Sequence, residues 1–351
     1  MIELRFTAFG CMLLAMLVWW GSAIASTDPL FASQEVLEVT LVGPFNKVAR
    51  DKAEEPEERP GQLSYVDASG VQQTLSVKLS PRGKSRRDRK VCTFPPLKLN
   101  LKKSEVKDTL FARQGNLKLV THCRSSERYQ SFLLKEFLVY RIFNELTPVS
   151  FNVRLMKITY EDSESKRDPF SRYGFVIEHK KRLAKRLDST VMEPMERIAV
   201  NSLDSEQAAI AELFQYLVSN TDYSFIAPPV GDNCCHNAVL FDAGDGGYFP
   251  VPYDFDRTGL VSPPNGLPDA TLGQRSFRDR VFRGFCHDDA VMTAALEKTR
   301  ASRQAIEQLI ASQIDLDRRS RDQTLNFVAA YYTIIDNEKK RKRELKCREL
   351  H

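Results

Sequence analysis

The spacing of apolar residues changes part-way along this 351-residue chain, and that change limits the folds it can adopt. In the first half, apolar residues alternate with polar ones or form short runs, which predicts strands at residues 36–42, 72–79, 97–101, 117–120, 152–160 and 173–178. From residue 204 onward they recur at helical spacing, which predicts helices at residues 206–219, 289–300, 302–314 and 322–335.

Three segments depart from this simple division. A helix is predicted at residues 132–146, because Ser125 and Ser126 supply a cap signal and Pro148 closes the segment. A glycine-rich turn joins a predicted hairpin at residues 238–251, and the acidic, proline-containing residues 51–60 predict an exposed loop. Strands before helices predict an α+β protein of two lobes. We expect a strand-rich lobe with one long helix at residues 26–187 and a mainly helical lobe at residues 188–351.

The first 25 residues have the layout of a secretory signal peptide. Arg5 precedes an apolar run from Phe6 to Trp20, and small residues follow up to Ala25. The run is shorter than the roughly 20 apolar residues of a membrane span, which disfavours the alternative of an uncleaved anchor. We therefore expect an exported protein, periplasmic or secreted, whose mature chain begins at Ser26 and keeps no stable membrane span.

Six cysteines follow the predicted cleavage site, and an even number in an exported chain favours disulfides over metal ligation. They are Cys92, Cys123, Cys234, Cys235, Cys286 and Cys347. We expect Cys92 to pair with Cys123, and one of the adjacent pair at residues 234–235 to pair with Cys286. A zinc site that includes residues 234–236 is the alternative, although adjacent cysteines do not match the usual ligand spacing.

The net charge of +5 is concentrated in two basic runs, at residues 82–90 and 339–343. We interpret the second run as a solvated helix end. The first run either folds over phosphate groups through Arg82 and Gly83 or is a solvated basic turn. We do not expect nucleic acid as a partner, because the chain is predicted to be exported and contains no recognisable nucleic-acid-binding module.

Residues 220–259 hold most of the side chains suited to chemistry. Asp222 follows an apolar helix on a loop, where a carboxylate can accept a proton from a hydroxyl group; the alternative is a turn residue that binds backbone amides. Asn237 begins a strand, and Asp254 and Asp256 lie two apart in an extended segment, so both carboxylates face one side. These oxygens suit Mg²⁺, or Mn²⁺, bound together with substrate phosphates. The order of the four residues predicts metal-dependent phosphoryl transfer.

These motifs resemble the CotH-type (spore-coat protein H) kinases, a family of atypical exported kinases with a protein-kinase-like fold. The resemblance covers roughly residues 80–260 and rests on Asn220-Thr221-Asp222, His236-Asn237 and Pro252-Tyr253-Asp254-Phe255-Asp256. Three further segments resemble an exported, uncharacterised bacterial branch; they begin at Cys92, Lys118 and Cys234. The resemblance implies a two-lobed kinase-like fold, with Asp222 as the base, Asn237 and Asp254 as metal ligands and Asp256 as a supporting carboxylate.

A kinase mechanism also needs a strand lysine on the nucleotide phosphates and a helix glutamate that holds this lysine. Lys118 lies on a predicted strand and Glu136 on the helix that follows, whereas Lys98 on the preceding strand is the alternative lysine. Glu178 ends a predicted strand and lies near the adenine only by analogy with the kinase fold. The expected ligands are therefore ATP and Mg²⁺.

Two features depart from ordinary kinases. Asp222 and Asn237 are 15 residues apart, against about five in the ordinary catalytic loop, so residues 223–233 must fold back. A disulfide at Cys234 or Cys235 would pin that loop. The first basic run also lacks the Gly-x-Gly-x-x-Gly pattern, so a nucleotide would bind without the ordinary glycine loop.

Three functions are compatible with this pattern. The first is an exported Mg²⁺-dependent kinase that transfers the γ-phosphoryl group of ATP to a hydroxyl group, by default a Ser or Thr of an exported protein. The second is a non-catalytic, pseudokinase-like protein for binding or envelope assembly. The third is a metal-dependent hydrolase that uses His236, Asp254 and Asp256.

Overall fold

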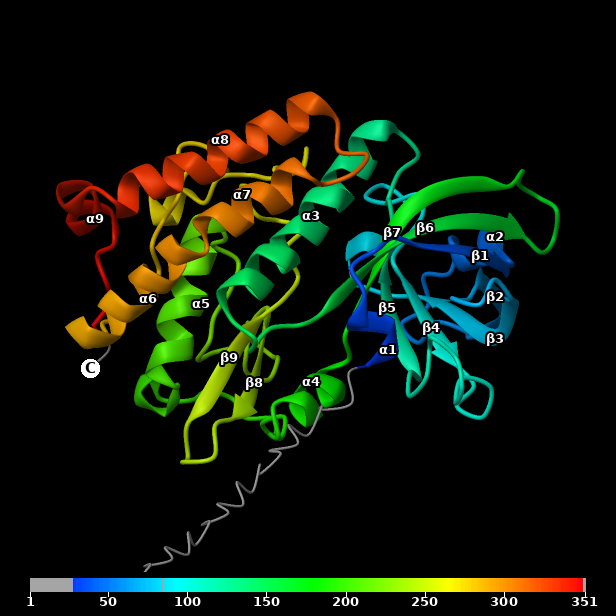
Figure 1. Ribbon diagram of the computed structural model, residues 1–351, viewed down its shortest axis with the longest axis horizontal. Helices are drawn as coiled ribbons and strands as arrows, with labels where there is room; N and C mark the ends of the chain where they lie inside the picture. Colours follow the sequence, from blue (N-terminus) through cyan, green and yellow to red (C-terminus); the bar gives the residue numbers. More distant parts are fainter. Residues whose placement is uncertain (1–27, 84, 350–351) are drawn as a thin grey trace, which may run out of the picture.

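The computed structural model describes residues 28–83 and 85–349. The predicted signal peptide, residues 1–25, lies outside the described residues. Figure 1 shows two parts side by side, a β-barrel and a group of helices, with α3 (Glu127–Leu146) running between them.

Seven strands form the barrel, in the order β1-β2-β3-β4-β5-β7-β6. They are β1 (Leu37–Gly43), β2 (Arg59–Val66), β3 (Gln72–Pro81), β4 (Leu97–Leu101), β5 (Asn116–Val120), β6 (Val153–Asp162) and β7 (Phe170–Ile177). Neighbouring strands are antiparallel except β1 and β6, whose parallel pairing closes the ring from Leu37 opposite Met156 to Gly43 opposite Asp162. Alternate side chains such as Leu41, Leu79 and Leu119 fill the interior.

The expected two-lobed protein-kinase-like fold is wrong, because the strands close into a mixed barrel. Strand β2 was not expected, since residues 51–60 predicted a loop and only Leu63 and Tyr65 of this strand are buried. Gly61 lets β2 lie close to β1, as a Cβ atom there would lie 2.5 Å from the carbonyl oxygen of Val42.

Most of the remaining elements form the helical part, which also contains one hairpin, whereas α1 (Pro29–Ala32) and α2 (Phe45–Val48) lie against the barrel (Figure 1). The helical part holds α5 (Ser205–Val218), β8 (Ala238–Asp242), β9 (Tyr248–Pro252), α6 (Asp289–Ala301), α7 (Arg303–Ala311), α8 (Arg318–Ile335) and α9 (Glu338–Glu344). The short helices α1, α2 and α4 (Lys180–Arg186) were not expected. One hydrophobic core joins α3, α5 and β7, and Phe143 stacks on Phe214 within it at 4.4 Å between ring centroids.

Three disulfides cross-link the described part of the chain. The pairing of Cys92 with Cys123 is confirmed. The pairing of Cys286 with one of the adjacent cysteines is wrong, because Cys286 bonds Cys347 and Cys234 bonds Cys235. The chain near Arg348 pairs with Phe285, and this contact brings Cys347 next to Cys286. The spacing of cysteines in the sequence cannot predict a contact between segments so far apart.

These disulfides exclude the zinc alternative, since all six cysteines are oxidised. Disulfides are typical of exported proteins. None of the helices within residues 28–83 and 85–349 has the length and apolar character that crossing a membrane requires.

Candidate active site

A cavity of about 340 Å³ opens where the barrel meets α3 and the loops of the helical part. We call it the charged cavity. Eight of the residues that the sequence singled out line it: Arg82, Lys118, Glu136, Glu178, Asp222, Asn237, Asp254 and Asp256. Residues that are far apart in the sequence and come from both parts of the molecule therefore share one space.

The end of α5 fixes the position of Asp222. Ser219 ends the helix in a left-handed conformation, and the buried Asn220 follows. The Asn220 side chain donates to the Gln215 side-chain oxygen at 2.9 Å and accepts from the Asp222 backbone N–H at 3.0 Å. Asn220 is thus a positioning residue, which explains its place two residues before the carboxylate.

The long loop after Asp222 does fold back. Ser224 and His236 exchange both backbone hydrogen bonds, at 3.0 and 3.1 Å. Asn237 consequently donates from its side chain to the Asp222 carbonyl oxygen at 2.7 Å, and His236 Nε2 lies 2.7 Å from Asp222 Oδ1. The fold thus brings Asp222 and Asn237 together across the gap that separates them in the sequence.

Phe255 holds the two carboxylates beside it in place. It is fully buried between Tyr140 of α3 and Phe214 of α5, with ring centroids 4.6 and 5.3 Å away. The backbone N–H of Asp254 donates to the Tyr140 hydroxyl oxygen at 3.0 Å. The segment is not fully extended, because Asp254 has a φ of 64°, and such left-handed residues are frequent at functional sites.

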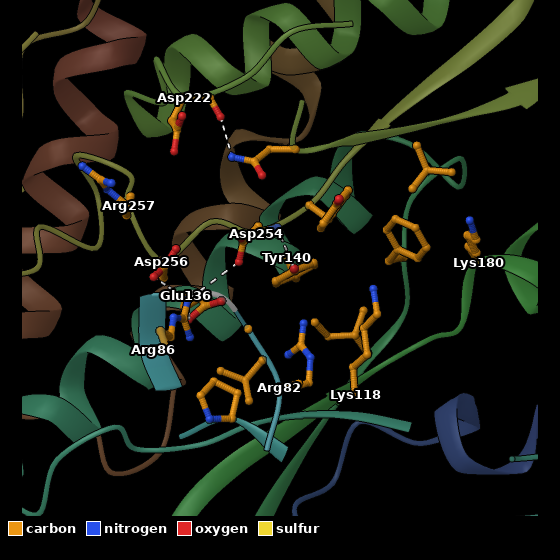
Figure 2. Close-up of a pocket in the computed structure, with 18 of the residues that line it drawn as sticks. Arg82, Arg86, Lys118, Glu136, Tyr140, Lys180, Asp222, Asp254, Asp256 and Arg257 are labelled. Carbon is orange, nitrogen blue, oxygen red and sulfur yellow. Dashed lines mark hydrogen bonds and ion pairs between the residues drawn. The ribbon is translucent and has the colours of Figure 1, made fainter. Parts of the chain in front are cut away.

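Arg86 lies among three carboxylates of the charged cavity (Figure 2). Its Nη2 forms an ion pair with Asp256 and lies 3.7 Å from Asp254 Oδ1 and 3.9 Å from Glu136 Oε2. The structure thus pairs Glu136 with Arg86, not with Lys118 as the kinase mechanism requires. The first basic run is therefore not simply a solvated turn, since Arg86 is directed into the protein and is 17% exposed.

The protonation of this cluster is shifted from ordinary values. Burial raises the pKa of Glu136 to about 8, against the opposing effect of Arg86. Burial also raises the pKa of Asp256, again against Arg86. Burial lowers the pKa of Arg86, but the three carboxylates outweigh it and raise that pKa above its ordinary value. At neutral pH Glu136 therefore carries a proton in a large share of molecules.

Three cations that line the charged cavity have no carboxylate partner: Arg82 and Lys118 from the barrel side, and Lys180 from the start of α4. Within the described residues, Arg82, Lys118 and Lys180 take part in no ion pair, and Lys118 lies 5.4 Å from the centroid of the Tyr253 ring. Figure 2 shows Arg82 and Lys118 directed into the cavity, with Asp222 on the opposite side. Desolvation by the cavity walls, and then Arg82, lower the pKa of Lys118 to about 8, although water still reaches its side chain.

The other two sequence candidates on the barrel side have partners outside the charged cavity. Lys98 donates to Glu58 at 2.9 Å and does not line the cavity, so Lys118 is the lysine that faces the carboxylates. The carboxylate of Glu178 accepts from Arg186 at 2.9 Å and is buried. Apolar side chains also line the charged cavity, namely Pro96, Val120, Phe151, Ile177, Val239 and Tyr253.

The donor set for a divalent cation is present but is not preformed. Within the described residues nothing donates a hydrogen bond to Asn237 Oδ1, and Asp254 is half-exposed, although its Oδ1 lies 3.7 Å from Arg86. Asp256 is held by Arg86. No three His, Cys, Asp or Glu side chains of the described chain are grouped as a metal site would require. The residues fit Mg²⁺ only together with water and substrate phosphates, which is how Mg²⁺ commonly binds.

Sequence reasoning did not find Arg86, Tyr140 or Lys180 as site residues. Nothing in the sequence separates Arg86 from the other arginines of its run. Tyr140 lies four residues after Glu136 on α3, and this spacing places both on one helix face, so it was a usable signal.

No family model matches the chain, and no curated protein matches it. One solved structure, described as that of a Helicobacter pylori proinflammatory kinase, CtkA, aligns with a TM-score of 0.40 and 9% identity over 72% of this chain and 92% of that chain. The resemblance to CotH-type kinases stays a prediction, and we transfer no residue role from this neighbour.

Proposed function

We propose that this protein is a phosphotransferase that moves the γ-phosphoryl group of ATP to a hydroxyl group, by default a Ser or Thr of an exported protein. The proposal rests on the presence, in the charged cavity, of cations without carboxylate partners together with carboxylates from the helical part. Arg82, Lys118 and Lys180 face it without carboxylate partners, while Asp222 and Asp254 line it from the helical part.

This division of charge suits a nucleoside triphosphate. Unpaired cations in a partly desolvated space are unfavourable unless an anion joins them, and phosphate oxygens are such anions. Apolar side chains such as Tyr253 and Phe151 suit a base, while Asp254 suits a divalent cation on the phosphates. One cavity thus offers apolar walls, cations and carboxylates for the three parts of a metal-bound nucleotide.

The chain's own residues then have defined tasks. Asp222 accepts the proton of the attacking hydroxyl group, and His236, when protonated at Nε2, donates to Asp222 and holds it in place. Lys118 and Arg82 position the phosphates. Bound Mg²⁺, or Mn²⁺, would be held by Asp254 and Asn237 and would neutralise phosphate charge.

One observation favours a second candidate, a nucleotide-binding protein without turnover. Arg86 neutralises Asp254 and Asp256, so the carboxylates that would hold the metal already have a cation among them. If Arg86 stays in contact with Asp254 and Asp256, the site binds a nucleotide through Lys118 and Arg82, but these carboxylates do not hold a metal ion.

Labelled phosphate separates these functions. Oxidised protein comprising residues 26–351 is incubated with γ-labelled ATP, Mg²⁺ or Mn²⁺, and an array of Ser- and Thr-containing peptides. We expect label on peptides, and its loss in Asp254→Ala. Label only in free phosphate would support the hydrolase. Stabilisation of the fold by ATP without release of label would support binding alone. An ATP concentration of 100 times Kd should add about 2.7 kcal/mol to the free energy of unfolding. Absence of every signal would disprove the proposal.

We expect the affinity for ATP, measured without divalent cations, to fall above pH 8. The free-protein pKa of Lys118 is about 8, and a bound anion raises it, so binding takes up a proton at higher pH. The association constant should then fall by up to tenfold per pH unit above pH 8. Below pH 8 the titration of Lys118 should change it little.

Calorimetry from pH 7 to 9 measures this effect. Lys118→Met should bind more weakly at pH 7 and lose the pH dependence. Lys98→Met is the matched control, since Lys98 lies on the neighbouring strand and pairs with Glu58 instead. An unchanged pH dependence in Lys118→Met would show that another group causes it.

A further inference from the structure

A second cavity, of about 280 Å³, adjoins the charged cavity and plays no part in the proposed nucleotide site. We call it the aromatic groove. Its apolar walls are Val91, Tyr129, Phe132, Leu133, Val261, Pro263 and Pro264, and the Cys92–Cys123 disulfide forms part of its lining. Tyr129 and Phe132 pack edge to face at 5.6 Å and remain half-exposed.

Cations lie beside this apolar surface: Lys90 and Arg124 line the groove, and Arg128 lies next to Phe132 without lining it. Arg124 lies 5.8 Å from the Tyr129 ring centroid, and Arg128 lies 5.4 Å from that of Phe132. Lys90 is exposed at the rim. Within the described residues, none of these three cations forms an ion pair with a carboxylate, although Arg124 donates to the backbone carbonyl oxygens of Val91 and Lys90. The groove therefore offers an apolar floor with an unneutralised positive rim.

The aromatic groove leads directly to the carboxylates of the charged cavity. Five residues line both spaces: Ser85, Arg86, Glu136, Asp256 and Arg257. The Arg86–Asp256 ion pair thus stands at the boundary between them. A chain bound in the groove would reach the nucleotide site past this ion pair.

We propose that the aromatic groove is the docking site of the acceptor, and that the acceptor is an acidic peptide segment with a large apolar side chain near its hydroxyl group. This inference rests on the proposed function and adds the acceptor class. The apolar side chain packs on Tyr129 and Phe132, and the acidic side chains meet Lys90, Arg124 and Arg128.

Size and chemistry favour a peptide over other anions. The volume lies just below the roughly 300–1,000 Å³ of small-molecule pockets, which suits one or two inserted side chains of a longer chain. A polysaccharide or another uniformly polar anion would meet the cations but leave the apolar floor without a matching group. An acidic peptide with an aromatic or large aliphatic residue satisfies both.

Direct binding of labelled peptides tests the docking site without any turnover. The probe is a fluorescent 12-residue peptide of Asp, Glu and Ser with one Phe and one Leu; the second probe replaces Phe and Leu by Ser, and the third replaces the acids by Lys. Anisotropy at low and physiological salt should show the first probe binding at least tenfold more tightly than either of the others.

Variants locate the binding surface. Lys90→Glu combined with Arg128→Glu, and separately Phe132→Ser, should each weaken the first probe at least tenfold. Lys339→Glu in the second basic run is the control and should leave binding unchanged, because α9 contributes nothing to the groove. Circular dichroism confirms that each variant is folded.

The outcomes test the docking site and the phosphoryl transfer independently of each other. Equal binding of the first two probes would show a site for any polyanion, and equal binding of the first and third would exclude charge recognition; either result overturns the proposal. Peptide binding without phosphoryl transfer would leave the docking site standing and disprove the phosphotransferase. Transfer to peptides irrespective of these substitutions would place the acceptor elsewhere.

Discussion

Replacing Asp222 by asparagine should lower the rate of phosphoryl transfer by about 10²- to 10⁴-fold, the usual contribution of a positioned base. The substitution keeps the shape of the side chain but removes its ability to accept the hydroxyl proton. It also keeps an oxygen within reach of His236, which now lies 2.7 Å from Asp222 Oδ1. Affinity for ATP should change little, because the phosphates meet Lys118 and Arg82 on the opposite side.

The measurement compares kcat and ATP binding in Asp222→Asn, His236→Gln and Asp242→Asn. Asp242 is an exposed carboxylate at the end of β8 and should be neutral to turnover. His236→Gln should lower kcat less than Asp222→Asn, because it removes the group that orients the base and not the base itself. Full turnover in Asp222→Asn would exclude Asp222 as the base and reduce it to a turn residue.

Local sequence patterns predicted individual elements better than their arrangement. The expected strand at residues 97–101 coincides with β4, and the expected helix at residues 132–146 lies within α3. Periodicity carries no information on which distant strands pair, however. The parallel pairing of Leu37 with Met156, which closes the barrel, links residues more than a hundred positions apart. The expected two-lobed kinase-like fold failed at that point.

The candidate site was predictable where polar residues cluster in the sequence. Asn220, Asp222 and Asn237 stood out because carboxylate and amide groups follow apolar segments there, and the structure links them by hydrogen bonds. The Arg86 contact was not predictable, because one arginine of a basic run turns inward only where buried carboxylates meet it. Those carboxylates come from α3 and from residues 254–256, which meet the run only in the folded protein.

Arg86 has the largest expected influence on metal binding. Its guanidinium lies among Glu136, Asp254 and Asp256, and a divalent cation at that place would meet its positive charge directly. Two unit charges about 4 Å apart interact by about 4 kcal/mol at an effective dielectric constant of 20, and the double charge of the metal makes this repulsion about 8 kcal/mol. Metal loading therefore requires the guanidinium to move away, or binds through Asp254 and Asn237 against its repulsion.

We expect Arg86→Met to bind Mn²⁺ about a hundredfold more tightly than the unaltered protein, because the carboxylates then have no internal cation; this is about 2.7 kcal/mol, less than the full repulsion. The metal-free variant should be less stable by about 3 kcal/mol, the lower end for loss of one partner of a buried ion pair. The lower end applies because Asp254 is half-exposed and Glu136 can take up a proton.

Protons should compete with the metal in this variant. The pKa of Glu136 is already about 8 with Arg86 present, and loss of the guanidinium raises it further. Glu136 is protonated below its pKa, so the Mn²⁺ affinity of Arg86→Met should fall as the pH is lowered from 8.5 to 6.5. Manganese binding followed by electron paramagnetic resonance measures both effects without turnover.

Arg89→Met is the matched control, because Arg89 is an exposed arginine of the same basic run and does not line the charged cavity. It should leave manganese affinity and the free energy of unfolding unchanged. An unaltered or weaker affinity in Arg86→Met would mean that the carboxylates do not receive the metal. Asp254 and Asp256 would then serve to hold Arg86 beside the phosphates, and the nucleotide-binding protein without turnover would become the better description of the molecule.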